Sequence, residues 1–270
     1  MSMEITFLGT GTSNGVPVIG CSCVVCRSTD ARDQRSRTSA VVRDGDRVYL
    51  IDTATELRQQ ALANGLDRVD AVLMTHAHAD HTGGFDDLRR FNELLGEHLP
   101  IFAGPETADA LRQRFAYAFE DIFPFYGGKP DLRLHVVEGP FDLFGKRVTP
   151  IPVRHGGGTV LGYRFGPLAY VTDAKEVPAT SMALLRGLDV LVLNALRERS
   201  HPTHLNVAEA VALIEELRPR RAYLVHLSHE LSFAAATALL PPGVSVAWDG
   251  LTVRVEETAP SETWRGASLA

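Results

Sequence analysis

One segment of seven residues constrains this chain more than any other. It reads THAHADH at positions 75–81 and follows a compact apolar run that is typical of a buried strand. Side chains two positions apart share one face of an extended chain, so His76 and His78 can bind one cation together. Asp80 and His81 come just past the turn and point toward a second cation. Surface loops favour Gly, Pro, Asn, Asp and Ser over histidine, so the segment predicts a metal site rather than a polar loop.

Three further candidate ligands end apolar runs in the same manner. His155, Asp173 and His226 each come at the end of a run that predicts a strand. A single histidine or aspartate at a strand end is more often structural than not, but three of them beside the 75–81 segment favour metal binding. A two-metal site needs this mixture, in which neutral imidazoles bind and an anionic carboxylate can bridge.

The cysteines predict a second, separate metal site. The chain has three, Cys21, Cys23 and Cys26, and all lie within six residues. An odd number this crowded is a poor disulfide framework, whereas reduced thiolates on a metal fit it better. Three thiolates leave a tetrahedral zinc one ligand short, so we expect a histidine from elsewhere to complete it. The alternative is a redox-active or merely buried cysteine cluster. Retained thiols favour a reducing compartment, most simply the cytoplasm.

The composition limits the class of protein. The chain has 270 residues, of which 45% are apolar, and a formal net charge of −6. It contains no apolar run near the about 18 residues of a membrane span, and its first residues lack the basic flank of a secretory signal. The negative charge argues against a broad footprint for nucleic acid. We therefore expect a soluble globular protein with a small-molecule partner, no membrane and no nucleic acid, and leave a homodimer open.

Predicted strands fall into two blocks, with helices between and after them. This pattern predicts two sheets packed face to face with helices outside, an α/β fold of the four-layer αββα sandwich type, in one domain over 1–270. The tail from about residue 257 looks frayed. Helices are predicted over 55–64, 85–95, 106–119 and 206–217, the last capped by Asn206 with Glu209. Strands are predicted over 4–8, 39–43, 47–51, 69–75, 132–137, 147–153, 162–165, 169–172, 188–194, 221–225, 244–247 and 252–255.

The pattern His-x-His-x-Asp-His at 76–81 resembles the signature of the metallo-β-lactamase superfamily, and the resemblance runs from the TFLGTGT segment at 6–12 to His226. It implies the αββα fold and a pair of divalent cations, Zn or Mn, that share a hydroxide. Asp173 would bridge them, and Asp80 would orient the hydroxide while it binds. The implied ligands of the first cation are His76, His78 and His155, and those of the second are Asp80, His81 and His226.

The cysteine segment at 21–26 resembles the PhnP-type phosphodiesterases of that superfamily, which act on phosphoribosyl 1,2-cyclic phosphate. In them three such cysteines and one histidine hold a structural zinc, which implies His229 as the fourth ligand here. The pyrroloquinoline-quinone biosynthesis protein of the same superfamily carries a similar cysteine knuckle, so the motif does not fix the substrate.

The segment His201-Pro-Thr-His204 contains no expected metal ligand. In PhnP-type enzymes and the related tRNA 3′-processing nucleases, a histidine in this neighbourhood protonates the leaving oxygen. Spacing to His226 favours His204 for that role, with His201 as second choice, against a polar loop that caps the next helix. Arg35 and Arg37 could clamp a phosphate, and they could equally be solvated loop charges.

The leading hypothesis is a metal-dependent phosphodiesterase that hydrolyses a small ester, such as a cyclic phosphoribosyl ester or a nucleotide. The enzyme alternatives are a tRNA 3′-endonuclease, disfavoured because no long basic arm is found, and a lactone or thioester hydrolase, disfavoured by the cysteine knuckle. A non-catalytic carrier like the quinone-pathway relative is the remaining class. The aromatic stretch at 119–129 could cover a base or sugar, form a dimer contact, or simply pack.

Overall fold

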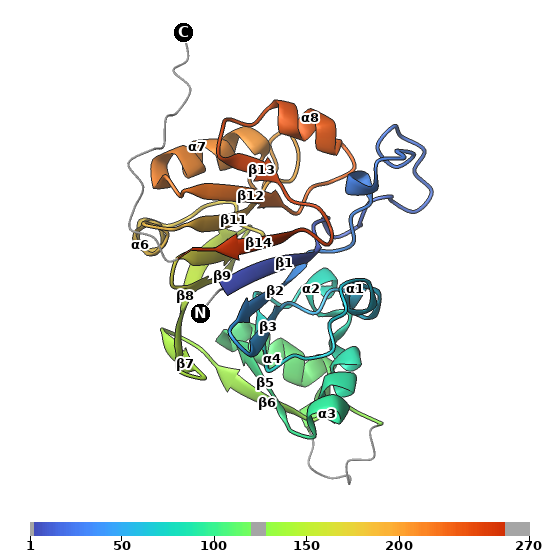
Figure 1. Ribbon diagram of the computed structural model, residues 1–270, viewed down its shortest axis with the longest axis vertical. Coiled ribbons are helices and arrows are strands. Elements are labelled where there is room, and N and C mark those ends of the chain that lie inside the picture. The colour runs from blue at the N-terminus through green and yellow to red at the C-terminus, as the bar shows by residue number, and fades with distance from the viewer. Residues whose placement is uncertain (1–2, 120–127, 257–270) are drawn as a thin grey trace.

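Two seven-stranded sheets form the centre of the computed structural model, which describes residues 3–119 and 128–256 (Figure 1). The first sheet has the order β14-β1-β2-β3-β4-β5-β6 and the second has the order β13-β12-β11-β10-β9-β8-β7. The strands of the first sheet are β1 Met3–Gly9, β2 Ser39–Asp44, β3 Arg47–Ile51, β4 Ala71–Met74, β5 Leu99–Ala103, β6 Leu132–Val136 and β14 Thr252–Val255. Those of the second are β7 Phe141–Leu143, β8 Lys146–His155, β9 Gly158–Phe165, β10 Leu168–Val171, β11 Val190–Asn194, β12 Arg221–Val225 and β13 Val244–Val246.

The two sheets pack against each other through one apolar layer. Ile5 and Phe7 alternate along β1 toward this layer, and Tyr163 and Phe165 do the same along β9; all four are 0% exposed. Tyr49 of β3 stacks on Phe165 across the layer, with ring centroids 5.9 Å apart. The face-to-face sandwich predicted from the strand pattern is therefore confirmed.

Helices cover the outer faces of both sheets. In Figure 1, α1 to α4 lie on one half of the molecule and α7 and α8 on the other. Apolar residues of α1, α3 and α4 join a cluster with β2 to β5, and those of α7 and α8 join a cluster with β10 to β12. Within the described residues, no helix is both long and apolar enough to span a bilayer. The helices are α1 Leu57–Ala63, α2 Ala79–Thr82, α3 Arg89–Leu95, α4 Pro105–Arg114, α5 Ala116–Phe119, α6 Ala179–Leu184, α7 Val207–Leu217 and α8 Phe233–Ala238, with 3-10 turns η1 Ala31–Asp33 and η2 Phe85–Leu88.

The best-defined helix start is that of α7. The Asn206 side chain accepts from the backbone N–H of Glu209, and the Glu209 carboxylate accepts from the N–H of Asn206. This reciprocal pair satisfies two backbone donors that a helix start leaves free. The cap predicted from the sequence is confirmed.

Some elements differ from the sequence-based expectation. β5 was missed because Pro100 lowers the strand signal, and β7 because it is only 3 residues long. The predicted helix over 85–95 is a 3-10 turn followed by α3, which ends where Gly96 adopts a left-handed conformation. The helix over 106–119 divides into α4 and α5 at Phe115. The predicted frayed tail from about 257, and residues 120–127 of the aromatic stretch, lie outside the described residues.

The topology brings distant segments to one edge of the sandwich. β3 and β4 run parallel in the first sheet, and β10, β11 and β12 run parallel in the second. The carboxyl ends of parallel strands meet at one edge, which is where open α/β sheets place their sites. The chain leaves β4 toward His76, β10 toward Asp173 and β12 toward His226.

Candidate metal centre

The seven predicted ligands of the active site come together in one cluster at this edge. Their ligand atoms form overlapping groups, within each of which all atoms lie within 4.8 Å of one another. Because His76 and His81 are shared between groups, the site is continuous rather than a set of separate pairs. Three groups contain predicted ligands alone, and a fourth joins two of them to His204: His76, His78 and His155; His76, His81 and Asp173; Asp80, His81 and His226; and His155, Asp173 and His204.

The 75–81 segment supplies four of these side chains through one sharp change of direction. His76 follows β4 and is buried, whereas His78 is the N-cap of α2 and is more open. His76 Nε2 and His78 Nδ1 lie 3.0 Å apart. α2 then turns His81 inward, where it is 0% exposed. The spacing of the motif thus places His76 and His78 in one group of candidate ligands and Asp80 and His81 in the neighbouring group.

Hydrogen bonds fix which nitrogen of each buried imidazole faces the cluster. Thr38 Oγ1 donates to Gly11 O, so it accepts from His226 Nδ1 at 3.0 Å. His155 Nδ1 donates to Thr203 O at 2.9 Å. In both rings, Nε2 is left with a free lone pair toward the cluster.

The buried carboxylate of Asp52 orients the rings of His81 and His76, the first directly and the second through Thr75. Asp52 Oδ2 accepts from His81 Nδ1 and from Thr75 Oγ1, both at 2.7 Å. The Thr75 hydroxyl, having donated to Asp52, accepts from His76 Nδ1 at 3.0 Å. Asp52 follows the end of β3 much as Asp173 follows the end of β10, so the same strand-end signal could have predicted Asp52 from the sequence.

Three residues that end strands at the site hold left-handed backbone. Asp52, Asp173 and His226 have φ values of 59°, 57° and 62°. Residues other than glycine adopt this region at an energetic cost, and such strain gathers at functional sites. The chain therefore turns sharply just past the ends of β3, β10 and β12, where these three side chains enter the site.

The charges in the cluster suit a cation. Burial lowers the pKa of His226 to about 4 against the opposing charge of Asp173, so this ring is neutral at pH 7. Burial also lowers the pKa of His81, but Asp173 and Asp52 outweigh it and raise that pKa well above its usual range. Burial raises the pKa of Asp173, and the charges of His226 and His81 more than reverse this. The Asp173 carboxylate is therefore ionised and draws positive charge to the centre.

One orphaned atom tests whether a cation fits. His81 Nε2 is buried and has no hydrogen-bond partner among the described residues. It lies 3.3 Å from Asp80 Oδ2 and 3.3 Å from Asp173 Oδ2. Buried polar groups without partners are rare in folded proteins. A divalent cation held by His81, Asp80 and Asp173 would give this nitrogen a partner, so the donor set fits a metal.

The segment 201–204 lies against the cluster. His204 Nε2 is 2.9 Å from Asp173 Oδ1, and its ring stacks on His226 with centroids 5.0 Å apart. His201 is one step further out, with its Nδ1 3.2 Å from His204 Nδ1. Of the two predicted proton donors, His204 therefore contacts the site directly and His201 contacts it through His204.

The thiols form a second cluster, and His229 completes it. His229 Nδ1 lies 3.3 Å from Cys21 Sγ and 3.5 Å from both Cys23 Sγ and Cys26 Sγ. The backbone N–H of Cys26 outweighs other effects and lowers the pKa of the Cys23 thiol to about 6, whereas burial raises that of Cys26 to about 11. Three sulfurs and one imidazole are a donor set that structural zinc prefers.

The structure corrects the prediction that Arg35 contacts a substrate. Its side chain is fully buried and donates to the backbone oxygens of Ser228 and Leu231 and to Asp33. Sequence position could not show this, because a charged residue in an Arg-rich loop is usually solvated. Arg37 is partly exposed and forms an ion pair with Glu56.

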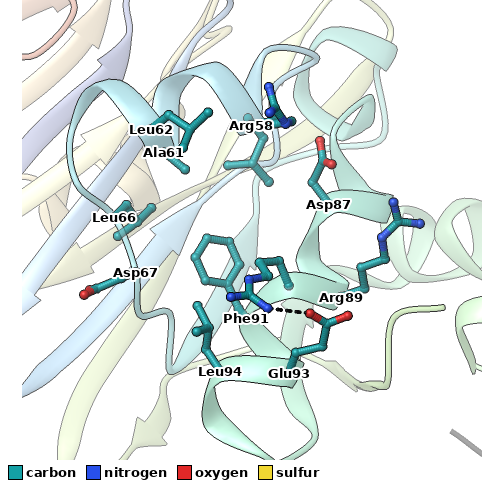
Figure 2. Close-up of a pocket in the computed structure, with 12 residues that line it drawn as sticks. Arg58, Ala61, Leu62, Leu66, Asp67, Asp87, Arg89, Phe91, Glu93 and Leu94 are labelled. Atoms are coloured by element: carbon teal, nitrogen blue, oxygen red, sulfur yellow. Dashed lines mark hydrogen bonds and ion pairs between the residues drawn. The ribbon is translucent and has the colours of Figure 1, made fainter. Parts of the chain in front are cut away.

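A groove elsewhere on the molecule is distinct from these clusters. It has a volume of about 560 Å³ and lies between α1 and α3, with apolar walls that include Leu62, Phe91 and Leu94 (Figure 2). The described residues that line it include none of the clustered ligands. The groove and the ligand cluster are therefore separate places on the molecule.

With this geometry in place, comparison with known proteins defines the class. A family model described as a beta-lactamase superfamily domain matches residues 47–227. The chain therefore belongs to the beta-lactamase superfamily.

Two solved structures resemble this chain over nearly its whole length. A solved structure described as a new diphosphatase from the PhnP family is 40% identical, covers 94% of this chain and 97% of its own, and has a TM-score of 0.88. Zn(2+)-bound PqqB from Methylobacterium extorquens is 22% identical over 93% of this chain and 99% of its own, with a TM-score of 0.74, and so shares the fold.

Proteins with similar sequences have different described activities. An octanoyltransferase from Porphyromonas gingivalis is 38% identical over 260 residues, which are 94% of this chain and 52% of that protein. A ribonuclease Z from Mycobacterium sp. strain KMS is 30% identical over 214 residues, 73% of this chain and 70% of that protein. The chain thus spans about half the length of the octanoyltransferase that it matches.

Proposed function

We propose that this chain is a metal-dependent phosphodiesterase that hydrolyses a small, cyclic or nucleotide-like phosphodiester or diphosphate. The observation that carries the proposal is the position of Asp173, whose Oδ2 lies 3.3 Å from His81 Nε2 while its Oδ1 lies 3.2 Å from His226 Nε2 and 2.9 Å from His204 Nε2. Because Asp173 also groups with His76 and with His155, one carboxylate lies among the candidate ligands of both cations and contacts the candidate proton donor. The 40% identity to a PhnP-family diphosphatase supports phosphorus chemistry in particular.

The donor atoms divide into two sets. Nε2 of His76, Nδ1 of His78 and Nε2 of His155 would hold one cation, Zn or Mn. Asp80 with Nε2 of His81 and of His226 would hold the other, with Asp173 between them. When bound, such a pair supplies a water molecule acidified toward neutral pH and neutralises charge on phosphoryl oxygens. The thiols and His229 would hold a structural zinc.

The chain's own residues then perform the remaining tasks. Asp80 stands beside His81 at the open side of the cluster, where its second oxygen can orient the attacking water. His204 Nε2 carries the proton that now bonds to Asp173, and it would pass this proton to the departing alkoxide. Thr203 Oγ1, 2.9 Å from His204 Nδ1, keeps the ring in that orientation.

A second candidate is hydrolysis of an acyl thioester or a lactone. It is favoured by the 38% identity to an octanoyltransferase, but the match covers about half of that protein, so acyl transfer can belong to the part that this chain does not match. The similarity to a ribonuclease Z raises the possibility of an RNA substrate. The net charge of −6 disfavours this, because RNA binding usually needs a positively charged surface. We further place the protein in the cytoplasm, because the thiolate ligands must stay reduced.

The test is a comparison of substrates on the full chain loaded with Zn²⁺ or Mn²⁺. Bis-(p-nitrophenyl) phosphate, a ribose cyclic phosphodiester and a dinucleoside diphosphate would be assayed beside a lactone and an octanoyl thioester. We expect turnover of the phosphorus esters, and its loss in His78→Ala while the circular dichroism spectrum is kept. Preferential turnover of the lactone or thioester would overturn the proposal. Metal content gives an independent result, with three ions per chain expected.

A further inference from the structure

The two metal-binding clusters share one short segment of chain. His226 belongs to the imidazole–carboxylate cluster and His229 to the thiol cluster, so three residues of backbone connect them. Three extended residues reach at most about 10 Å. A shift of this segment at one cluster must therefore move a ligand of the other. What holds the segment decides how strongly the two clusters depend on each other.

The loop at 10–12, just past β1, holds the inner half of the segment through backbone hydrogen bonds. Leu227 N donates to Thr10 O, and Leu227 O accepts from Thr12 N. Gly11, in the middle of that loop, packs against the chain at Arg35, where an added Cβ would lie 2.7 Å from Arg35 O and 2.9 Å from Arg35 Cβ. Three stretches of backbone are thus pressed together beside His226, with no room for a side chain at position 11.

The outer half is held by a single guanidinium. Arg35 Nη1 donates to Ser228 O and to Leu231 O, both at 3.0 Å, and Nη2 donates to Asp33 Oδ1 at 3.0 Å. Asp33 Oδ1 also accepts from Phe233 N at 2.6 Å. These contacts enclose His229 between two anchored carbonyls. A buried guanidinium with three acceptors in a fixed fork is a use that lysine cannot reproduce.

The backbone of the same arginine holds the loop that leads into the thiols. Arg35 N donates to Val16 O at 2.7 Å, and Val16 N donates to Arg35 O at 2.8 Å. Val18 N then reaches Cys26 Sγ at 3.3 Å. Arg35 therefore contacts both sides of the thiol cluster, the cysteine loop by its backbone and the histidine segment by its side chain.

We propose that Arg35 is a positioning residue that couples the thiol cluster to the imidazole–carboxylate cluster, by anchoring Ser228 O and Leu231 O on either side of His229. The inference rests on the metal assignments of the proposed function. Filling the thiol cluster then fixes the segment and tightens metal binding at His226, and by thermodynamic reciprocity the reverse holds. Couplings between sites are typically about 5- to 150-fold in affinity.

The experiment measures metal affinity with the thiol cluster intact and disabled. The full chain and its Cys23→Ser variant would be titrated with Zn²⁺ against a chromophoric chelator. Co²⁺ titrations would show which cluster fills, because thiolate ligands give charge-transfer absorption that imidazole and carboxylate do not. In the natural background we expect Cys23→Ser to weaken binding at the imidazole–carboxylate cluster about tenfold.

Measuring the effect of Cys23→Ser on metal affinity in two arginine variants tests whether Arg35 carries the coupling. In Arg35→Lys, the effect of Cys23→Ser should fall to about twofold or less, because the segment is already released. Arg164→Lys is the matched control: Arg164 also donates to three backbone oxygens, those of Gly166, Leu184 and Arg186, but contacts neither cluster. It should keep the tenfold effect.

The outcomes separate the inference from the function on which it rests. An equal effect of Cys23→Ser in the natural and Arg35→Lys backgrounds, or no effect in the natural one, would overturn the coupling while leaving the enzyme proposal standing. No metal at the imidazole–carboxylate cluster in any variant would overturn both. If Arg35→Lys does not fold, Asp33→Asn loosens the same anchor while it keeps an acceptor for Phe233 N, and a residual coupling of about threefold is expected.

Discussion

His155 Nδ1 lies 2.9 Å from the backbone oxygen of Thr203, so a ligand of the metal centre is oriented by the loop that carries the candidate proton donor. The ring of His155 also meets that of His204, with centroids 4.8 Å apart. The loop and the ligand therefore form one unit. Any change that displaces Thr203 is expected to disturb metal binding and proton transfer together.

Gly156 is the residue where this unit is most easily disturbed. Its φ is +58°, and a Cβ built there would lie 3.0 Å from Thr203 Cγ2. We predict that Gly156→Ala lowers kcat on bis-(p-nitrophenyl) phosphate about 10- to 100-fold, because small displacements of catalytic groups are that costly. The left-handed backbone should also reduce the free energy of unfolding by about 1 kcal/mol.

Gly157→Ala is the matched control for this prediction. Gly157 has no heavy atom within 4 Å of an added Cβ, and its φ lies outside the left-handed region. We expect its kcat to stay within about twofold of the natural chain. Equal losses in the two variants would show that the hairpin, rather than the contact with Thr203, matters.

The sequence predicted the metal ligands well because their signal is local or nearly so. His76, His78, Asp80 and His81 form one motif, and a strand end marks each of the other three ligands. The layered fold followed from the order of strands and helices. The fourth ligand of the thiol cluster, His229, needed the resemblance to a family, because 203 residues separate it from Cys26.

What sequence reasoning could not supply is which polar residues become buried. Arg35 and Arg37 lie two positions apart, yet Arg35 is 1% exposed and Arg37 is partly open. The difference arises from the segment at 228–231, which packs over Arg35 from the far end of the chain. Likewise Thr38 orients His226 across 188 positions of sequence. Such contacts depend on the tertiary fold, and no local sequence pattern predicts them.

His204→Ala tests the proton donor. Loss of a general acid matters most when the leaving oxygen is a poor leaving group, because a p-nitrophenolate departs without help. We predict that kcat on an alkyl phosphodiester falls about 10²- to 10⁴-fold, and that the loss on bis-(p-nitrophenyl) phosphate is much smaller. His201→Ala should cause a lesser change on both substrates. Equal losses of His204→Ala on the two substrates would assign this ring to binding instead.

Cys23→Ser tests the structural role of the thiol cluster. Structural zinc contributes folding free energy, so we predict that this variant unfolds at a temperature at least about 4–8 °C lower, equivalent to about 2 kcal/mol in a chain of this size. Turnover at saturating metal should persist below that temperature. Ser22→Ala, in the same loop but outside the cluster, is the control and should unfold with the natural chain. An unchanged melting temperature for Cys23→Ser would remove the structural-zinc assignment.

A partly buried carboxyl group beside the loop at 10–12 gives a prediction for the pH dependence of stability. Asp249 accepts from Thr10 Oγ1 at 2.8 Å and from the N–H and Oγ of Ser36, both at 2.7 Å. Burial outweighs these donors and raises the pKa of Asp249 from 3.8 to about 6. Between those values the folded chain binds more protons than the unfolded chain. The contribution of Asp249 to stability is therefore greatest below about pH 4 and falls as the pH rises through 6.

We predict that Asp249→Asn removes this part of the pH dependence. The shift of about two pKa units corresponds to at most about 3 kcal/mol, so the free energy of unfolding of the natural chain should fall by up to that amount, relative to Asp249→Asn, between pH 4 and 7. Urea denaturation of both chains at several pH values measures the difference. Asp67→Asn, at an exposed position, should run parallel to the natural chain. Parallel curves for Asp249→Asn as well would mean that the Asp249 carboxylate is ionised throughout this range, and that its three donors outweigh its burial.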